Sequence, residues 1–171
     1  WRIGKNSFPR GNYGIYANLS WKGFSANILF QGATSRDMYI EDVVRGQSTG
    51  GYTMVYPYQM DYWMPDNTNA KFPRIAMNSS VNGNNNYVTS DFWLVNGRYI
   101  RLKSLQLGYD FRSVLLKNIK WLYKCQVVLS GQNLFTISPA TKYGFDPENG
   151  STNNYDYPMQ RVYAISLNLG F

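Results

Sequence analysis

Residues 13–33, YGIYANLSWKGFSANILFQGA, contain two alternating stretches around a Lys-Gly pair, and this pattern decides the fold. Apolar side chains recur at every second position in both stretches, which predicts β-strands rather than helices. Gly23 can adopt the positive φ that a two-residue hairpin turn requires. If Trp21 pairs with Phe24, the apolar faces of the two strands coincide, so we expect an antiparallel hairpin in that register.

Three further stretches alternate in the same way, at residues 99–111, 121–133 and 161–171. At the beginning of the first, Arg101 and Lys103 fall in phase with the apolar positions. Either a bulge shifts the phase there, or that end of the strand lies outside the apolar environment. All five stretches are longer than the ~5–6 residues of an ordinary strand and close to the ~9–11 that cross a bilayer at a tilt.

The connections between these strands alternate between short and long, at residues 22–23, 34–98, 112–120 and 134–157. Outer-membrane barrels have short periplasmic turns and long extracellular loops. We therefore expect an all-β fold, an antiparallel transmembrane β-barrel segment, with the two long connections extracellular and the C-terminus periplasmic. Because a barrel needs about eight strands to close, the remaining strands are expected outside this chain.

The composition of the 171 residues excludes several classes of function. Without His, the chain cannot supply a Ser-His-Asp triad, a Cys-His pair or a His-ligated metal. A single Cys excludes an internal disulfide and a thiolate zinc site, and Cys125 lies among apolar positions as a small hydrophobic residue. We expect neither enzymatic activity nor a cofactor.

Positive charge is concentrated in residues 98–124, where seven Lys and Arg residues accompany Asp110 as the single acid. Such a surface can attract nucleic acid or anionic lipid. The sequence shows no recognition helix, glycine-rich phosphate loop or RNA-binding aromatic motif, so we expect no nucleic-acid partner. Outer-membrane lipid and lipopolysaccharide are the expected anionic neighbours, and a solvated face is the alternative.

Six stretches in a fixed order carry a family resemblance. They are WMPDNTNAKFPR at 63–74, SDFWL at 90–94, GRYIRLKSLQLGY at 97–109, SGQNLF at 130–135, YGFDPE at 143–148 and YPMQR at 157–161. Over most of residues 63–171, the chain resembles the C-terminal barrel region of the SusC/RagA-type TonB-dependent outer-membrane transporters of Bacteroidetes. Residues 13–33 match less specifically.

The resemblance implies the last five or so strands of a barrel of about 22 strands, filled by an N-terminal plug. It also implies active uptake of glycans or peptides across the Gram-negative outer membrane, with a SusD-like surface lipoprotein as partner and energy from the TonB complex. The plug, the TonB-contacting segment and the N-terminal strands are expected outside residues 1–171. The chain itself would supply barrel wall and extracellular loops.

A secreted β-sandwich that binds carbohydrate is the alternative from another class. It would share the aromatic residues, the polar loops and the alternation. In a sandwich, however, the apolar faces of two sheets are buried against each other. The exposure of the apolar faces therefore separates the two interpretations.

Two sets of candidate functional residues follow. The last strand offers an amphipathic edge and an aromatic end, which resembles the signal that the barrel-assembly machinery reads, at Tyr163, Ile165, Leu167, Leu169 and Phe171. A lipid-facing strand without a signal role is the alternative. In the long loops, Trp63, Trp93 and Tyr143 could stack on a substrate, or could instead pack within the loops.

Oxygen-bearing side chains between residues 146 and 156 could offer ligands to Ca²⁺, namely Asp146, Glu148, Asn149 and Asp156. Their spacing is not that of an EF-hand loop. The Asp146-Pro147 pair is typical of a turn, which we expect in place of a metal site.

Overall fold

The computed structural model describes residues 8–41, 55–76, 85–86, 88–116, 118–149, 152, 157 and 159–171. The chain divides into two compact units, each described by itself below. The sheet unit comprises Gly11–Thr34, Tyr99–Ile137 and Met159–Phe171, and the loop unit comprises Trp1–Arg10, Ser35–Arg98 and Ser138–Pro158. Among the described residues, no helix is both long enough and apolar enough to cross a membrane.

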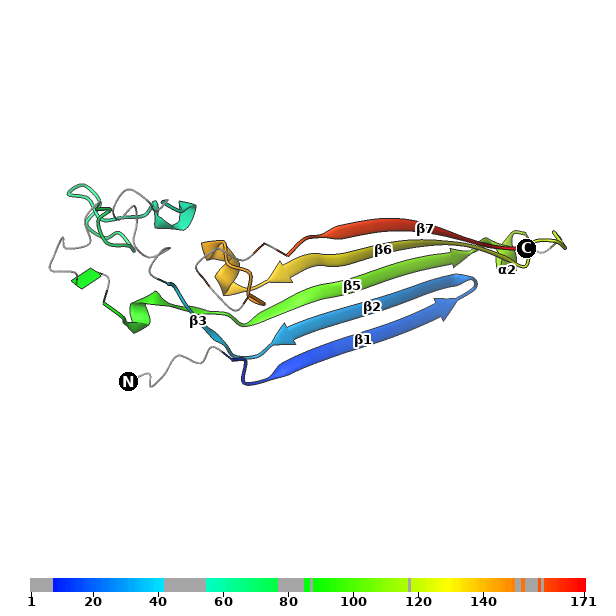
Figure 1. The fold of residues 1–171 in the computed structure, drawn as a ribbon, viewed down its shortest axis with the longest axis horizontal. Helices are drawn as coiled ribbons and strands as arrows, with labels where there is room; N and C mark the ends of the chain where they lie inside the picture. The colour runs from blue at the N-terminus through cyan, green and yellow to red at the C-terminus, as the bar shows by residue number, and fades with distance from the viewer. Residues whose placement is uncertain are drawn as a thin grey trace. The chain divides into compact units, whose positions relative to one another are not determined.

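Five antiparallel strands form the sheet unit, and each pairs with the next one along the sheet (Figure 1). They are β1 (Asn12–Trp21), β2 (Phe24–Ala33), β5 (Tyr99–Asp110), β6 (Lys124–Ile137) and β7 (Val162–Gly170). The sheet is open, with β1 and β7 at its edges. The predicted all-β antiparallel barrel segment is thus confirmed as a fold.

The predicted first hairpin has the predicted register, with Trp21 opposite Phe24 and Leu19 opposite Ala26. Lys22 and Gly23 form the turn with φ of 44° and 84°. Two consecutive positive φ values are typical of the type I′ turn, whose twist matches that of the flanking strands. The turn residues and the alternation of the flanking strands therefore determine the hairpin locally.

A bulge at Lys103 resolves the phase conflict in β5. The pairing with β2 passes from Leu29 opposite Ser104 directly to Phe30 opposite Leu102, so Lys103 is the extra residue. One extra residue exchanges the two faces of the strand beyond it. Leu102 therefore joins the apolar face, and Arg101 falls on the polar face, where Nε donates to Thr136 Oγ1 at 2.7 Å.

The strand β6 extends to Ile137, whereas we predicted its end at residue 133 and the second long connection from residue 134. The apolar alternation of the sequence is interrupted at Asn133, which adopts a φ of 53°. Two residues of β6 oppose the single Lys103 of β5, and pairing resumes at Leu102 opposite Phe135. The long connection accordingly begins at residue 138.

One face of the sheet unit is apolar from edge to edge and is exposed. On β7, Ile165 is 78% exposed and Leu167 is 60% exposed. Their neighbours across β6, Leu129 and Val127, continue the same face. A β-sandwich would bury these side chains, so the sandwich interpretation is wrong.

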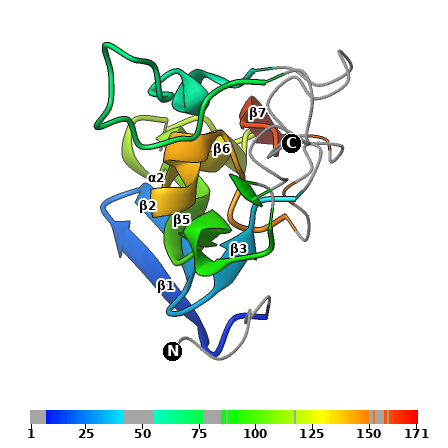
Figure 2. The same ribbon diagram turned by 90° about the vertical axis from the view of Figure 1, so that its left-hand side faces the viewer.

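The loop unit has its own core, formed by segments that are far apart in the sequence. The buried residues are Met38, Ile40, Phe72, Trp93, Val95, Ala140 and Phe145. They come from or next to the antiparallel pair β3 (Asp37–Tyr39) and β4 (Leu94–Asn96), η4 (Asp91–Trp93) and η5 (Pro139–Tyr143), with Phe72 from the first long connection. Tyr58 of η2 (Pro57–Gln59) packs against this core. In Figure 2, β3 and the orange segment that contains η5 face the viewer.

Arg36 joins the two long connections inside the loop unit. Its guanidinium donates to the carbonyl oxygens of Pro147 and Asn149, and its side chain is buried. Thr152 adds a second link, because its hydroxyl donates to the Tyr39 carbonyl oxygen. The second long connection is thus tied to the first.

Gly32 is required by close approach in the sheet. A Cβ at this position would overlap the ring of Tyr13 and the carbonyl oxygen of Tyr99, to which the Tyr13 hydroxyl donates at 3.1 Å.

We predict that Gly32→Ala lowers the free energy of unfolding by about 1–3 kcal/mol, measured by urea titration. Gly14→Ala is the matched control, since its Cβ would lie 3.7 Å from the nearest atom, the Phe30 carbonyl oxygen. Equal effects at both positions would contradict the prediction.

Candidate ligand site in the loop unit

Asp61 shapes the segment that presents the first aromatic side chain of the site. One carboxylate oxygen accepts from Asn67 Nδ2 and the other from the Lys71 backbone N–H, each at 3.2 Å. The backbone closes the same segment, with Trp63 N–H donating to the Phe72 carbonyl oxygen at 3.0 Å. These bonds place Trp63 next to Phe72.

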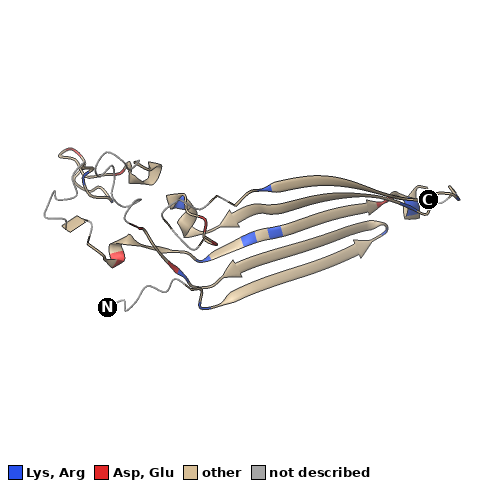
Figure 3. Cartoon of the chain, viewed as in Figure 1, with Lys and Arg blue, Asp and Glu red and all other residues tan. Residues whose placement is uncertain are grey.

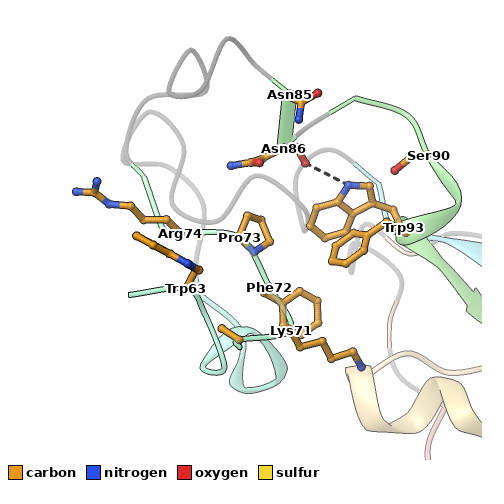
Figure 4. Close-up of a pocket in the computed structure, with 11 residues that line it drawn as sticks. Trp63, Lys71, Phe72, Pro73, Arg74, Asn85, Asn86, Ser90 and Trp93 are labelled. Carbon is orange, nitrogen blue, oxygen red and sulfur yellow. Dashed lines mark hydrogen bonds between the residues drawn. The ribbon is translucent and has the colours of Figure 1, made fainter. Parts of the chain in front are cut away.

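The short helix η4 supplies the other wall. Phe92 packs edge-on against Trp93, with ring centroids 4.9 Å apart. The indole Nε1–H of Trp93 donates to the Asn86 carbonyl oxygen at 3.2 Å (Figure 4). This bond fixes residues 85–86 beside η4.

Between the two walls lies a cavity of about 580 Å³. Its lining combines aromatic and apolar groups with cations, amides and a hydroxyl: Trp63, Ala70, Lys71, Phe72, Pro73, Arg74, Asn85, Asn86, Ser90, Phe92 and Trp93. Figure 4 shows Trp63 and Arg74 on one side and Trp93 with Ser90 on the other. Pockets for small ligands have this composition, an apolar surface with a few polar groups that set orientation.

The described lining residues give the pocket a positive charge, because they include Lys71 and Arg74 and no Asp or Glu. Lys71 is held in place, with Nζ 2.8 Å from the Tyr143 hydroxyl and 4.9 Å from the centre of that ring. Arg74 is exposed. The site therefore suits a ligand with a flat apolar surface beside a neutral polar or anionic group.

The three loop aromatics predicted as substrate-binding lie in this region but differ in accessibility. Trp63 lines the pocket and is 40% exposed. Trp93 also lines it, but is only 1% exposed and belongs to the core of the loop unit. Tyr143 packs against that core and reaches the pocket through its contact with Lys71.

Sequence reasoning missed the polar part of the pocket. Lys71 and Arg74 lie in the same stretch as Trp63, and the mixture of cations and aromatic residues in that stretch could have indicated the pocket. Asn85 and Asn86 end a polar run at residues 78–86, most of which lies outside the described residues.

The predicted turn at Asp146 is confirmed. Asp146 Oδ1 accepts from Glu148 N–H at 2.9 Å, and the Asp146 carbonyl oxygen accepts from Asn149 N–H at 3.1 Å. Within the part of the chain that the structure describes, no group of three or more His, Cys, Asp or Glu residues is placed to hold a metal ion. Asp156 lies outside that part.

The terminal residues predicted as an assembly signal lie at the open edge of the sheet unit. Tyr163, Ile165, Leu167 and Leu169 occupy β7, which pairs with β6 on one side only. Phe171 stacks on Trp121, with ring centroids 5.6 Å apart and planes inclined by 7°. The aromatic end is thereby fixed to the sheet.

Tyr58 lies at the centre of the aromatic cluster beneath the pocket. Its ring contacts those of Phe72 and Tyr143 at 5.5 and 5.2 Å. Its hydroxyl oxygen is buried and makes no hydrogen bond among the described residues. Burial raises the pKa of Tyr58 above the ordinary value, with Tyr56 and Tyr143 adding to the shift, so the phenol is neutral at physiological pH.

We predict that Tyr58→Phe raises the free energy of unfolding by roughly 1 kcal/mol, because an unsatisfied buried hydroxyl is removed and the ring is kept. Tyr58→Ala should lower it by about 3 kcal/mol, since the ring is lost from the cluster. Both are measured by thermal or urea unfolding. A loss of stability in Tyr58→Phe would show that the hydroxyl has a stabilising partner.

Comparison with known proteins identifies relatives over almost the whole chain. TonB-dependent receptor P3 of Formosa agariphila is 27% identical over 177 residues, which cover 95% of this chain and 16% of that receptor. TonB-dependent receptor P39 of the same organism is 26% identical over 172 residues, which cover 92% of this chain and 16% of that receptor. No family model matches the chain.

Solved structures agree with the sequence relatives. The RagAB peptide importer in its open-open state matches 99% of this chain with a TM-score of 0.72 and 26% identity. Its closed-closed state matches with a TM-score of 0.69 and 25% identity. The chain spans 18% of either matched chain, so it corresponds to a small part of these relatives.

Proposed function

We propose that this chain, a barrel segment of the SusC/RagA-type TonB-dependent transporters, forms wall and extracellular loops of an outer-membrane nutrient importer. The importer takes up glycans or peptides with energy from the TonB complex. A SusD-like lipoprotein is its surface partner, and the plug and the remaining strands complete the barrel. The relatives are named as receptors and importers rather than enzymes, which supports a transport role.

The observation that carries the proposal is the exposed apolar face of the sheet unit. Four charged residues lie in its five strands, Arg101, Lys103, Asp110 and Lys124 (Figure 3). In water, an exposed apolar surface of this extent would drive association. Facing lipid, the same side chains are in their preferred solvent.

The two edges of the sheet require further strands. In hydrocarbon, each backbone group without a hydrogen bond costs several kcal/mol, so β1 and β7 must pair with strands of the complete barrel. The free edge of β7, with the alternation from Tyr163 to Phe171, suits the proposed role as assembly signal. The short turns then face the periplasm, and the two long connections are extracellular.

In this arrangement the pocket at Trp63 contacts the imported ligand outside the membrane. The exposed indole provides a flat surface for a sugar ring or an apolar side chain. Lys71 and Arg74 attract negative charge, and the described lining residues include no acid to oppose them. The pocket thus contributes to ligand capture before transport.

We predict that Ile165→Arg lowers barrel stability by about 2–4 kcal/mol, because a cation on the lipid-facing side is costly. Its neighbour provides the control, since Ser166→Arg places the same cation on the opposite face. The assay is urea unfolding of the intact transporter in lipid vesicles. Equal destabilisation by both variants would refute the assignment of the faces.

A second prediction concerns the pocket. Trp63→Ala should weaken ligand binding by roughly 1 kcal/mol, about fivefold in Kd, through loss of the stacking surface. Binding is measured by calorimetry on the intact transporter with a panel of neutral and acidic oligosaccharides and short peptides. Val88→Ala, an exposed change outside the pocket, should have no effect. Unchanged binding in Trp63→Ala would exclude the pocket from ligand capture.

A further inference from the structure

The short connections meet at one edge of the sheet unit, which we term the turn edge: Lys22, Gly23, residues 110–116 and 118–123, and the end of β7. The registers place them together, because Trp21 pairs with Phe24, Phe24 with Tyr109, and Lys124 with Gly170. Lys and Arg residues are visible at this end of the sheet in Figure 3. Neither the transport role nor the ligand pocket uses this surface.

The turn edge carries cations that its own structure does not neutralise. The side chains of Lys22 and Lys120 are exposed. The carboxylate of Asp110 is engaged as the cap of α2 (Phe111–Val114), where Oδ1 accepts from the backbone N–H of Arg112 and of Ser113. Net positive charge therefore faces solvent here.

Arg112 differs from these lysines because it is a structural residue. Its Nε donates to the Leu122 carbonyl oxygen at 2.5 Å, and its Nη1 donates to that of Leu116 at 2.9 Å. These bonds brace the connection between α2 and β6. The lysines, by contrast, are available to an outside anion.

Exposed aromatic rings accompany the lysines. Trp21 is 71% exposed and Trp121 is 67% exposed, and Lys22 Nζ lies 5.1 Å from the centre of the Trp21 ring. Trp121 is held by its stack on Phe171. Tryptophan rings at this density are typical of the boundary between hydrocarbon and headgroups.

We propose that the turn edge binds the phosphate headgroups of anionic phospholipids, with Lys22 and Lys120 as the cationic ligands and Trp21 and Trp121 at the level of the headgroups. The inference rests on the proposed membrane location of the sheet. The charge selects an anionic lipid over a zwitterionic one, and the adjoining apolar face restricts the site to a membrane. Each lysine near an anionic surface strengthens binding about fivefold.

The test uses the intact transporter, purified in detergent and analysed by native mass spectrometry with equal amounts of phosphatidylglycerol and phosphatidylethanolamine. We expect preferential retention of phosphatidylglycerol. The preference should fall about fivefold with Lys120→Gln and further in the double variant Lys22→Gln, Lys120→Gln. The double variant Lys22→Arg, Lys120→Arg should keep it, since the charge is retained.

The control is Lys142→Gln, which removes the same charge from an exposed site in η5 of the loop unit and should leave the preference unchanged. Equal retention of both lipids, or a preference that survives the double Gln variant, would overturn the inference. Binding of lipopolysaccharide in place of phosphatidylglycerol at these lysines would also overturn it. These outcomes are independent of the comparison of Ile165→Arg with Ser166→Arg, which tests the membrane location itself.

Discussion

The paired bulge around Lys103 is the constraint on which the sheet depends. A strand has a side-chain period of two, so a single phase error would turn every side chain beyond it to the wrong face. Without the bulge, Arg101 would lie among the apolar residues, and Leu102 would lie among the polar ones. With it, one apolar surface runs unbroken from β1 to β7, and Arg101 bonds to Thr136 on the other side.

Much of the sheet follows from its sequence because the information is local. The Lys-Gly turn and the alternation between Tyr13 and Ala33 fix the first hairpin and its register. The bulge was visible as a phase conflict at Lys103, though only as one of two explanations. The extent of β6 was not predictable, since Asn133 interrupts the pattern in the sequence and the pairing with β5 continues past it.

The loop unit was less predictable because its structure depends on contacts between distant residues. The pairing of β3 with β4 and the burial of Trp93 under Phe72 join segments that no local pattern connects. Trp63 and Trp93 are similar in sequence context, yet one is accessible and the other is buried. Aromatic content indicated that these loops hold rings; only the fold distinguishes a binding surface from a core.

The Arg36 link has a consequence for how these loops can be exchanged. Its guanidinium donates hydrogen bonds to two carbonyl oxygens of the second long connection. Ala140 and Phe145 of that connection belong to the core of the loop unit. Neither connection is therefore an autonomous module. A chimaera that takes one connection from a relative would leave the buried Arg36 guanidinium facing a foreign backbone. Ligand specificity in the loop unit therefore has to be transferred with both connections together. The two connections also have to evolve together.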